Sequence, residues 1–304
     1  MGERPVEEHP RGALFSHASL VAMPIGAPAA LVVAAVYGLP AHAVVILAVS
    51  LGIAGLGITL GLHRFLTHRA FATHRPVEWG LMVMGCMAGQ SSPFFWVATH
   101  RKHHRLSDHE GDPHSPHASR GGWLARFWHA YMGWTIAWVP YDPGSIRDLT
   151  RRADLVWIDR RWYLWYLLGL ALPAGAGYLI GGTAYDALIG FLWGGMLRHA
   201  ITQHATYMVN SVAHVWGHRA FETGDHSRNS FLLALFTMGD GWHNNHHAQP
   251  YSARHGFSWW QVDGTWCVIW LMERAGLAWD VRRPRLPPQH VTEPQPPAVA
   301  HPLS

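Results

Sequence analysis

Apolar residues are concentrated in four long runs, which predict spans at about residues 20–39, 41–62, 162–182 and 185–205, and the fourth run is apolar to about residue 200. Each run is near the roughly 20 residues that an α-helix needs to cross a bilayer. A helix of this length in a soluble core would normally show a polar face, and these runs show none. The last one continues as an amphipathic pattern toward His214. The pattern therefore predicts an all-α integral membrane protein with four transmembrane helices.

The charges between the runs orient the predicted helices. The connectors "PAH" and "GTAYD" within the two helix pairs carry neither Arg nor Lys, whereas the long segment between the pairs is rich in Arg. Loops rich in Arg and Lys stay in the cytoplasm. We therefore expect both connectors outside, and both termini and the central region in the cytoplasm. The expected architecture is two helical hairpins with a cytosolic helical cap.

Two shorter apolar stretches, 79–97 and 230–238, are predicted to be in-plane or cap helices. The first is interrupted by "GQSSP" and the second is too short to cross a bilayer. Residues 1–18 are polar and include acids, unlike a cleaved signal peptide. The Pro-rich end, residues 281–304, is predicted to be disordered. Residues 19–280 are therefore assigned to a single membrane domain.

Composition supports a membrane protein and argues against a nucleic-acid-binding one. Charged residues make up 14% of the chain, compared with about 25% in soluble domains. The isoelectric point near 9.3 comes from Arg residues that lie mainly between the apolar runs, so membrane topology explains the basic charge. The two cysteines, Cys86 and Cys267, lie in apolar segments and are expected to be buried and unpaired.

Two segments, "HRKHH" and "HNNHH", carry the same spacing of three histidines. Positions i, i+3 and i+4 share one face of an α-helix, so each triplet is expected to aim its imidazoles at one point. The triplets are His100, His103 and His104, and His243, His246 and His247. A third cluster, His63 and His68, directly follows the second apolar run. These two are about 140° apart on an ideal helix, so they converge only if the helix end unwinds or the pair straddles a metal.

Eight clustered imidazoles predict a metal centre with more than one ion. Four or five nitrogens for each of two ions is a natural division. Imidazole suits iron, zinc, copper and nickel, but a structural zinc site usually includes Cys, and no Cys lies near the clusters. A pair of iron ions with redox or oxygen chemistry is the favoured interpretation.

The segments "GLHRFLTHRAF", "HRKHHRLSD…GDPHSP", "NSVAH" and "GDGWHNNHHAQPYSARHG" resemble the membrane-bound fatty acid desaturases. The resemblance is to the Δ9 (stearoyl-CoA desaturase-like) branch, in its bacterial type, and covers most of residues 55–278. It implies four transmembrane helices in a bacterial inner membrane and a cytosolic cap that holds a di-iron centre. It also implies O₂-dependent insertion of a cis double bond, at Δ9, into a saturated acyl chain.

Matched box to box, the resemblance implies nine histidine ligands. They are His63, His68, His100, His103, His104, His214, His243, His246 and His247. It further implies that Asn210 holds a metal-bound water. Asn210 and His214 are four residues apart, so they share one face near the end of the fourth predicted helix.

Ligating imidazoles need an acceptor for their other N–H group. Asp112 and Asp240 are the candidates for this role. The remaining histidines, among them His114 and His255, match no ligand position, and a few are expected to support the ligands.

The resemblance also implies an external electron donor, because the sequence has no Rossmann G-x-G-x-x-G, no Cys cluster and no fused cytochrome domain. A ferredoxin, a rubredoxin or a cytochrome b5 type carrier with its reductase would supply the electrons. Animal acyl-CoA enzymes have an Arg-Asp pair where this chain has Ala98 and Thr99. The acyl chain can therefore arrive on CoA, on acyl carrier protein or on a membrane lipid.

Two other functions fit part of the pattern. Membrane di-iron hydroxylases of acyl chains or alkanes share similar histidine boxes, but the residues that flank the boxes favour desaturation. A metal-binding transporter would place its ligands near the bilayer midplane, whereas nearly all of the clustered histidines lie beyond the apolar runs.

Overall fold

The computed structural model describes residues 10–136 and 142–285, with side chains from Leu20 onward. Residues 1–9 of the predicted polar segment and residues 286–304 of the predicted disordered tail therefore lie outside the described residues, whereas residues 10–18 begin the helix α1. The first residues of that tail are described and are paired. The backbone N–H of Arg282 donates to the carbonyl oxygen of Ala70 at 2.8 Å.

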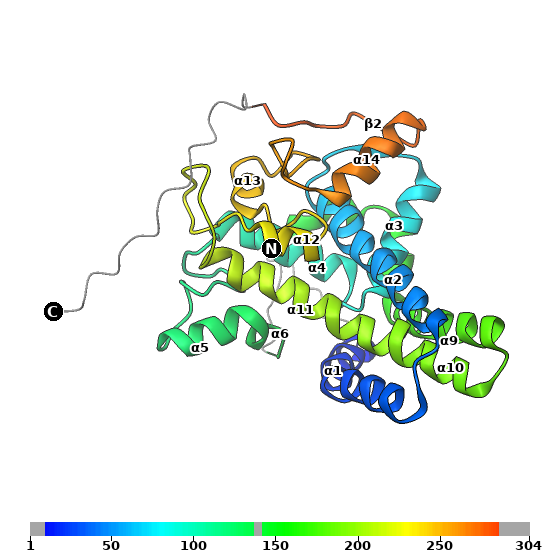
Figure 1. Ribbon diagram of the computed structural model, residues 1–304. Helices are drawn as coiled ribbons and strands as arrows, with labels where there is room; N and C mark the ends of the chain where they lie inside the picture. Colours follow the sequence, from blue (N-terminus) through cyan, green and yellow to red (C-terminus); the bar gives the residue numbers. More distant parts are fainter. Residues whose placement is uncertain (1–9, 137–141, 286–304) are drawn as a thin grey trace.

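The described part is mostly helical (Figure 1). The helices are α1 Pro10–Tyr37, α2 Ala41–Leu56, η1 Gly57–Thr67, α3 Arg75–Met87, α4 Pro93–Leu106, α5 Trp123–Trp128, η2 His129–Gly133, α6 Trp134–Ile136, η3 Pro143–Ile146, α7 Arg147–Thr150, α8 Ala153–Asp159, α9 Trp162–Gly181, α10 Ala184–Gly190, η4 Phe191–Leu197, α11 Arg198–Ser211, η5 Val212–His214, α12 Phe231–Phe236, α13 His243–Ala248 and α14 Gly264–Arg274. Two short strands, β1 Ala72–Thr73 and β2 Ala278–Trp279, pair antiparallel.

Three helices of the described part are long and apolar enough to cross a membrane: Leu20–Tyr37, Ala41–Thr67 and Trp162–Gly181. They correspond to the first three apolar runs. The second helix extends past its predicted end at residue 62, because η1 continues α2 without a break.

The fourth predicted helix, 185–205, is a continuous helical path made of α10, η4 and α11. It is not among the three helices that composition alone singles out. Arg198 lies in the middle of this path with its side chain buried. Its guanidinium donates hydrogen bonds to backbone carbonyls of α3, α9 and its own helix. The charge is therefore solvated by other helices, as polar groups in membrane bundles are.

The two short connectors lie side by side. The hydroxyl of Tyr185 donates to the carbonyl oxygen of Gly38, and the rings of Tyr37 and Tyr185 are 6.2 Å apart. Nε2 of His42 lies 3.2 Å from a carboxylate oxygen of Asp186. The loops predicted to share one side of the membrane thus occupy the same end of the helix bundle.

The second hairpin is tight because glycines allow close approach of its backbones. A Cβ atom on Gly177 would lie 2.1 Å from the carbonyl oxygen of Asp186, and one on Gly190 would lie 2.3 Å from that of Pro173. Gly182, with φ of +82°, ends α9 in the left-handed conformation that glycine adopts without strain.

A buried apolar core joins η1, α3, α4, α8 and α9. The apolar stretch 79–97 is divided between α3 and α4, which are separated by a turn, so it is not one helix. Cys86 is buried in this core, whereas Cys267 on α14 is exposed, and both are free. The expectation of burial was wrong for Cys267, because it lies on the exposed side of α14 together with Trp270 and Leu271.

Candidate metal centre

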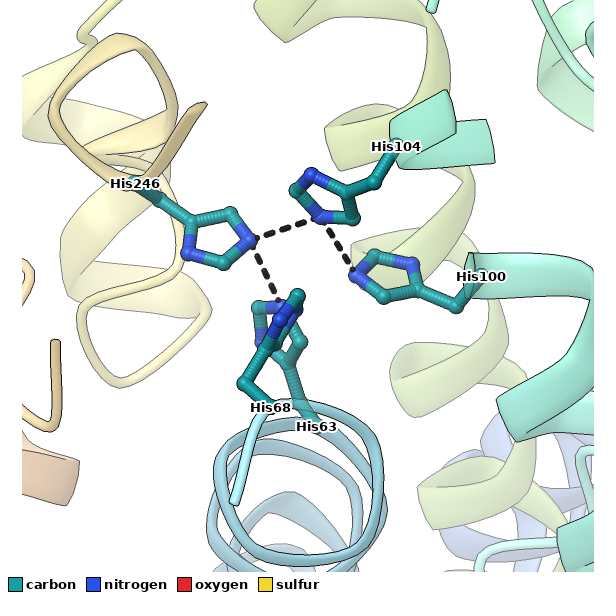
Figure 2. Close-up of side chains that lie close together, drawn as sticks. All are labelled: His63, His68, His100, His104 and His246. Atoms are coloured by element: carbon teal, nitrogen blue, oxygen red, sulfur yellow. Dashed lines mark hydrogen bonds between the residues drawn. The ribbon is translucent and has the colours of Figure 1, made fainter. Parts of the chain in front are cut away.

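The nine histidines predicted as ligands form two groups. The first cluster contains His63, His68, His100, His104 and His246. The second cluster contains His103, His214, His243 and His247. Within each cluster the candidate ligand atoms all lie within 4.8 Å of one another. In the first cluster, rings from η1, α4, α13 and the residue after η1 point toward one another (Figure 2).

The π-helix η1 explains how His63 and His68 converge. A π-helix closes hydrogen bonds between residues i and i+5, and the backbone N–H of His68 donates to the carbonyl oxygen of His63 at 3.1 Å. Residues five apart therefore lie on the same side, with ring centroids 5.0 Å apart. The sequence predicted convergence only through an unwound helix end or a shared metal, and the π-helix is a third route that it did not predict.

Each triplet is divided between the two clusters, so the expectation that its three imidazoles aim at one point was wrong. On α4, His100 and His104 join the first cluster and His103 joins the second. On α13, His246 alone joins the first. Adjacent residues point about 100° apart on a helix, so consecutive histidines separate while residues four apart stay together. The two helices therefore bridge both clusters.

The Nε2 atoms of neighbouring rings nearly touch. That of His246 lies 3.0 Å from Nε2 of His63 and 2.9 Å from Nε2 of His104. In the second cluster, the Nε2 atoms of His214 and His243 are 3.0 Å apart. Two unprotonated ring nitrogens at this distance repel each other unless a proton or a cation lies between them, which makes these clusters suited to metal ions.

Four aspartate carboxylates accept hydrogen bonds from the Nδ1 atoms of clustered histidines. Asp240 accepts a hydrogen bond from Nδ1 of His63 at 2.9 Å, and Asp112 accepts one from Nδ1 of His103 at 3.0 Å. These are the two aspartates proposed from sequence. An ionised carboxylate only accepts hydrogen bonds, so it fixes the proton on Nδ1 and leaves the Nε2 lone pair for a metal.

Two further aspartates of this kind were missed in the sequence. Asp108 accepts from Nδ1 of His214 at 2.8 Å, and Asp225 accepts from Nδ1 of His247 at 2.6 Å. Asp108 stands four residues after His104, the last histidine of the second box, which was a usable signal. Asp225 lies in the loop before α12, and nothing in its local sequence distinguishes it.

Two more buried histidines lie against the clusters. The ring of His255 is 4.4 Å from that of His246, and its Nδ1 is 3.3 Å from Asp240. The ring of His114 is 4.4 Å from that of His103. Both were assigned to no ligand position, and they form an outer layer around the predicted ligands.

Burial keeps most of the clustered imidazoles neutral, which is the form that binds metals. Burial, followed by the charge of neighbouring imidazoles, holds the pKa values of His68, His100, His104 and His246 well below the ordinary value. The pKa of His243 is lowered for the same reasons. Burial lowers the pKa of His247 to about 4, against the opposing effect of Asp225.

The carboxylates remain ionised despite their surroundings. Burial alone would raise the pKa of Asp108 and Asp225, but hydrogen bonds and attraction from His214 and His247 hold both well below the ordinary range. Burial likewise acts to lower the pKa of His103, yet the charge and hydrogen bond of Asp112 outweigh it and the pKa is raised.

An apolar cavity of about 340 Å³ lies between α2, η1, α4, α11 and residues 235–243. His63, His100 and His243 form part of its wall, together with Asn210. Asn210 is buried, on the helix whose continuation ends at His214. The cavity therefore gives an apolar molecule access to both clusters.

Hydrogen bonds fix part of the cavity wall. Nε1 of Trp96 donates to Oε1 of Gln90 at 2.9 Å, and Nε2 of Gln90 donates to the hydroxyl of Thr206 at 2.6 Å. Trp96 and Thr206 both line the cavity. This bridge ties α4 to α11, so the shape of the cavity is set by the fold.

The comparisons with known proteins agree with this site. Residues 19–279 match the family described as Fatty acid desaturase. The chain is 40% identical over 235 residues to the hex-5-enoyl-[acyl-carrier protein] acetylenase of Moorena producens, covering 75% of this chain and 73% of that protein. It is 38% identical over 232 residues to the sn-1 stearoyl-lipid 9-desaturase of Anabaena variabilis (75% and 79% covered). It is 37% identical over 249 residues to the Delta-9 acyl-lipid desaturase 1 of Arabidopsis thaliana (81% and 76% covered). The chain belongs to the fatty acid desaturase family.

Proposed function

We propose that this protein is an oxygen-dependent desaturase that inserts a cis double bond, at Δ9, into a saturated fatty acyl chain. The observation that carries the proposal is the convergence of nine histidines, from distant segments, beside an apolar cavity. Membership of the desaturase family and the names of two relatives as Δ9 acyl-lipid enzymes support the same activity.

Each cluster is proposed to hold one iron ion, with the nine histidines as ligands. Two imidazole nitrogens bound at right angles to one ion at about 2.1 Å lie about 3.0 Å apart, close to the Nε2 separations of both clusters. Among the nine predicted ligands, three have a buried Nε2 atom without a hydrogen-bond partner, which also fits a metal: His68, His103 and His247. Clusters of four and five imidazoles suit iron better than structural zinc.

The protein's own residues would bind the metal ions, orient the ligand rings and shield the acyl chain from bulk water. Iron with O₂ supplies the oxidising power for removing hydrogen from an unactivated methylene, which no side chain has. The aspartates orient the ligand rings, and Asn210 is proposed to hold a metal-bound water. The cavity holds the acyl chain with one pair of carbons beside the clusters and excludes bulk water, and this positioning selects the bond.

We further propose the membrane arrangement implied by the sequence. Residues 19–280 form one domain with four transmembrane helices in two hairpins, and the clusters and both termini are cytoplasmic. The contact between the two connectors, made by Tyr185 and Gly38, supports a common outer side. The bacterial inner membrane is the proposed location.

The reaction needs partners from outside the chain. A ferredoxin, rubredoxin or cytochrome b5 type carrier with its reductase is proposed to deliver the electrons. The acyl chain is the proposed substrate whether CoA, acyl carrier protein or a lipid carries it.

Expression in a host that lacks desaturases tests the proposal. Lipid profiling is expected to show a new cis double bond, and metal analysis of the purified protein is expected to show bound iron. His246→Ala is expected to abolish the product and lower bound iron, whereas His74→Ala, at an exposed histidine outside both clusters, should match the parent. A hydroxylated product in place of the alkene, or normal desaturation by the His246 variant, would refute the assignment.

A further inference from the structure

The short helix α12 presents apolar side chains to the outside of the protein. Leu232 is 64% exposed and Phe236 is 68% exposed, and Phe231 and Leu235 are about half exposed. Only Leu233 and Ala234 of this helix are buried. A water-facing helix would carry polar groups at these positions, and an exposed apolar face of this kind marks a contact with a partner or a membrane.

The position of α12 beside an apolar helix indicates that lipid covers its exposed face. The chain just after α12 packs on Gly55, because a Cβ atom there would lie 2.9 Å from the sulfur of Met238. Gly55 is fifteenth in the apolar helix Ala41–Thr67, and about 20 apolar residues are needed to cross a bilayer. The chain directly after α12 therefore meets this helix within its apolar length. Because this helix is proposed to span the bilayer, the contact places α12 near the depth of the lipid acyl chains.

The cavity opens beside α12. Its outer lining includes Leu51 of α2, Ile201 of α11, and Leu235 and Phe236 of α12, of which the last three are exposed. All four are apolar. The opening thus lies between α2 and α11, which belong to proposed transmembrane helices, and α12, whose exposed side chains are apolar.

We propose that α12 lies in the cytoplasmic leaflet and forms one edge of a side entrance, through which an acyl chain passes directly from the bilayer into the cavity. A short helix with an apolar outer face lies in the membrane interface with that face in the acyl region. The exposed side chains of α12 contact lipid, and Leu51, Ile201 and Leu235 frame the entrance.

This inference rests on the proposed function, which makes an acyl chain the substrate. Of the three possible carriers of that chain, the side entrance favours a bilayer glycerolipid. The phosphates of CoA and the acidic surface of an acyl carrier protein bind to Arg or Lys side chains. The residues that frame the entrance, Leu51, Ile201 and Leu235, supply none, whereas an acyl chain that stays attached to its lipid needs only an apolar path.

Fluorescence quenching tests the depth of α12 independently of catalysis. Leu232→Cys and Phe236→Cys are made in a Cys267→Ser background, where the remaining Cys86 is buried, and are labelled with an environment-sensitive dye. In nanodiscs that contain one copy of the protein, lipids brominated on their acyl chains should quench both labels strongly. A matched control, Glu222→Cys, lies in the preceding loop at a side chain that is 96% exposed and should be unaffected. Labels at 232 and 236 that behave like the control would overturn the proposal, since a protein partner or a second copy would then cover this face.

A pair of substitutions on one helix tests the entrance. Leu235→Trp narrows the opening, whereas Leu232→Trp changes a neighbouring exposed residue that does not line the cavity. With stearoyl chains present only on nanodisc lipid, the Leu235 variant should lose most of its turnover and the Leu232 variant should retain it. Bound iron should be equal in both. Equal turnover in the two variants, or turnover only with stearoyl-CoA or stearoyl-acyl carrier protein, would overturn the side entrance. Failure to desaturate any of the three substrates would count instead against the proposed function.

Discussion

Asp225 shows how a residue remote from a histidine box can orient a proposed ligand, His247. It lies in the loop before α12 and accepts a hydrogen bond from Nδ1 of His247 at 2.6 Å, while Ser227 and Thr223 donate to its other oxygen. The carboxylate is therefore itself held in place before it orients the ring. Nothing in a linear pattern marks this residue, because its partner is 22 positions away and the two meet only in the folded chain.

Asp225→Asn is expected to weaken iron binding about 10- to 100-fold, the usual effect of losing an acceptor behind a ligating histidine. The amide keeps the size of the side chain but is a weaker acceptor, and it can present a donor to the ring. Bound iron after dialysis against graded chelator concentrations measures the effect. Glu222→Gln is the control, because it neutralises an exposed acid in the same loop. Equal iron retention in both variants would show that Asp225 does not support a ligand.

Acid is expected to destabilise the metal-free protein in a defined pH range. Burial lowers the pKa of His247 and His255 to about 4 in the folded protein, against about 6.5 in the unfolded chain. Between these values the unfolded chain binds more protons, so the free energy of unfolding falls as pH falls, on the order of 1 kcal/mol per pH unit for each group. His103, with its raised pKa, does not alter this trend, because below about pH 6.5 it is protonated in both the folded and the unfolded chain.

Thermal unfolding of the metal-free protein in detergent measures this dependence. Tm should begin to fall near pH 6.5 and continue to fall toward pH 4, above the range in which Asp108 and Asp225 take up protons. A Tm that stays level until the carboxylates titrate would contradict the neutral, buried state of these imidazoles.

At the scale of the helix, the sequence predicted which histidines come together but not how they are divided between the two clusters. The spacing of His63 and His68 conflicts with an α-helix, and that conflict pointed to altered helix geometry, which η1 supplies as a π-helix. The triplets carried no such signal. Spacing of i, i+3 and i+4 puts three rings on one broad face. Which ring joins which cluster depends on the other helices packed against that face, and His103 and His246 each join a different cluster from the rest of their triplet.

The π-helix depends on a close contact with α3. A Cβ atom on Gly57 would lie 2.4 Å from the carbonyl oxygen of Met84, a backbone atom that cannot move aside cheaply. Gly57→Ala is therefore expected to push η1 away from α3, at a cost of about 1–3 kcal/mol, and to misplace His63. Tm and bound iron should both fall.

Gly80→Ala, on α3 itself, is the matched control for this helix contact. A Cβ atom there meets nothing within 4 Å, so alanine should leave iron unchanged and raise stability by up to about 1 kcal/mol through its helix propensity. If Gly57→Ala behaves like Gly80→Ala, the close packing of η1 on α3 does not position the first cluster.

For the whole molecule, the apolar runs and their connectors predicted the helical architecture, because membrane crossing imposes length and composition directly on the chain. The fourth helix was harder to define by composition, since it buries Arg198 among backbone carbonyls that only the folded bundle provides. The course of the segments between the hairpins was not predictable in detail. Their packing is set by contacts between distant residues, such as the pairing of Ala72 with Trp279.

The clusters connect helices from distant parts of the chain, so metal removal should affect the whole protein. The first cluster ties η1 to α4 and α13, and the second ties α4 to His214 and α13. An ion that binds only the folded state adds about 2.7 kcal/mol of stability at a hundred times its Kd. Chelation should therefore lower Tm, and iron should restore it. A variant with His243→Ala and His246→Ala, which removes a ligand from each cluster, should already have the lower Tm and should not respond to iron. A parent protein whose Tm is the same with and without iron would show that the histidines are held by packing alone and that the ions do not link these segments.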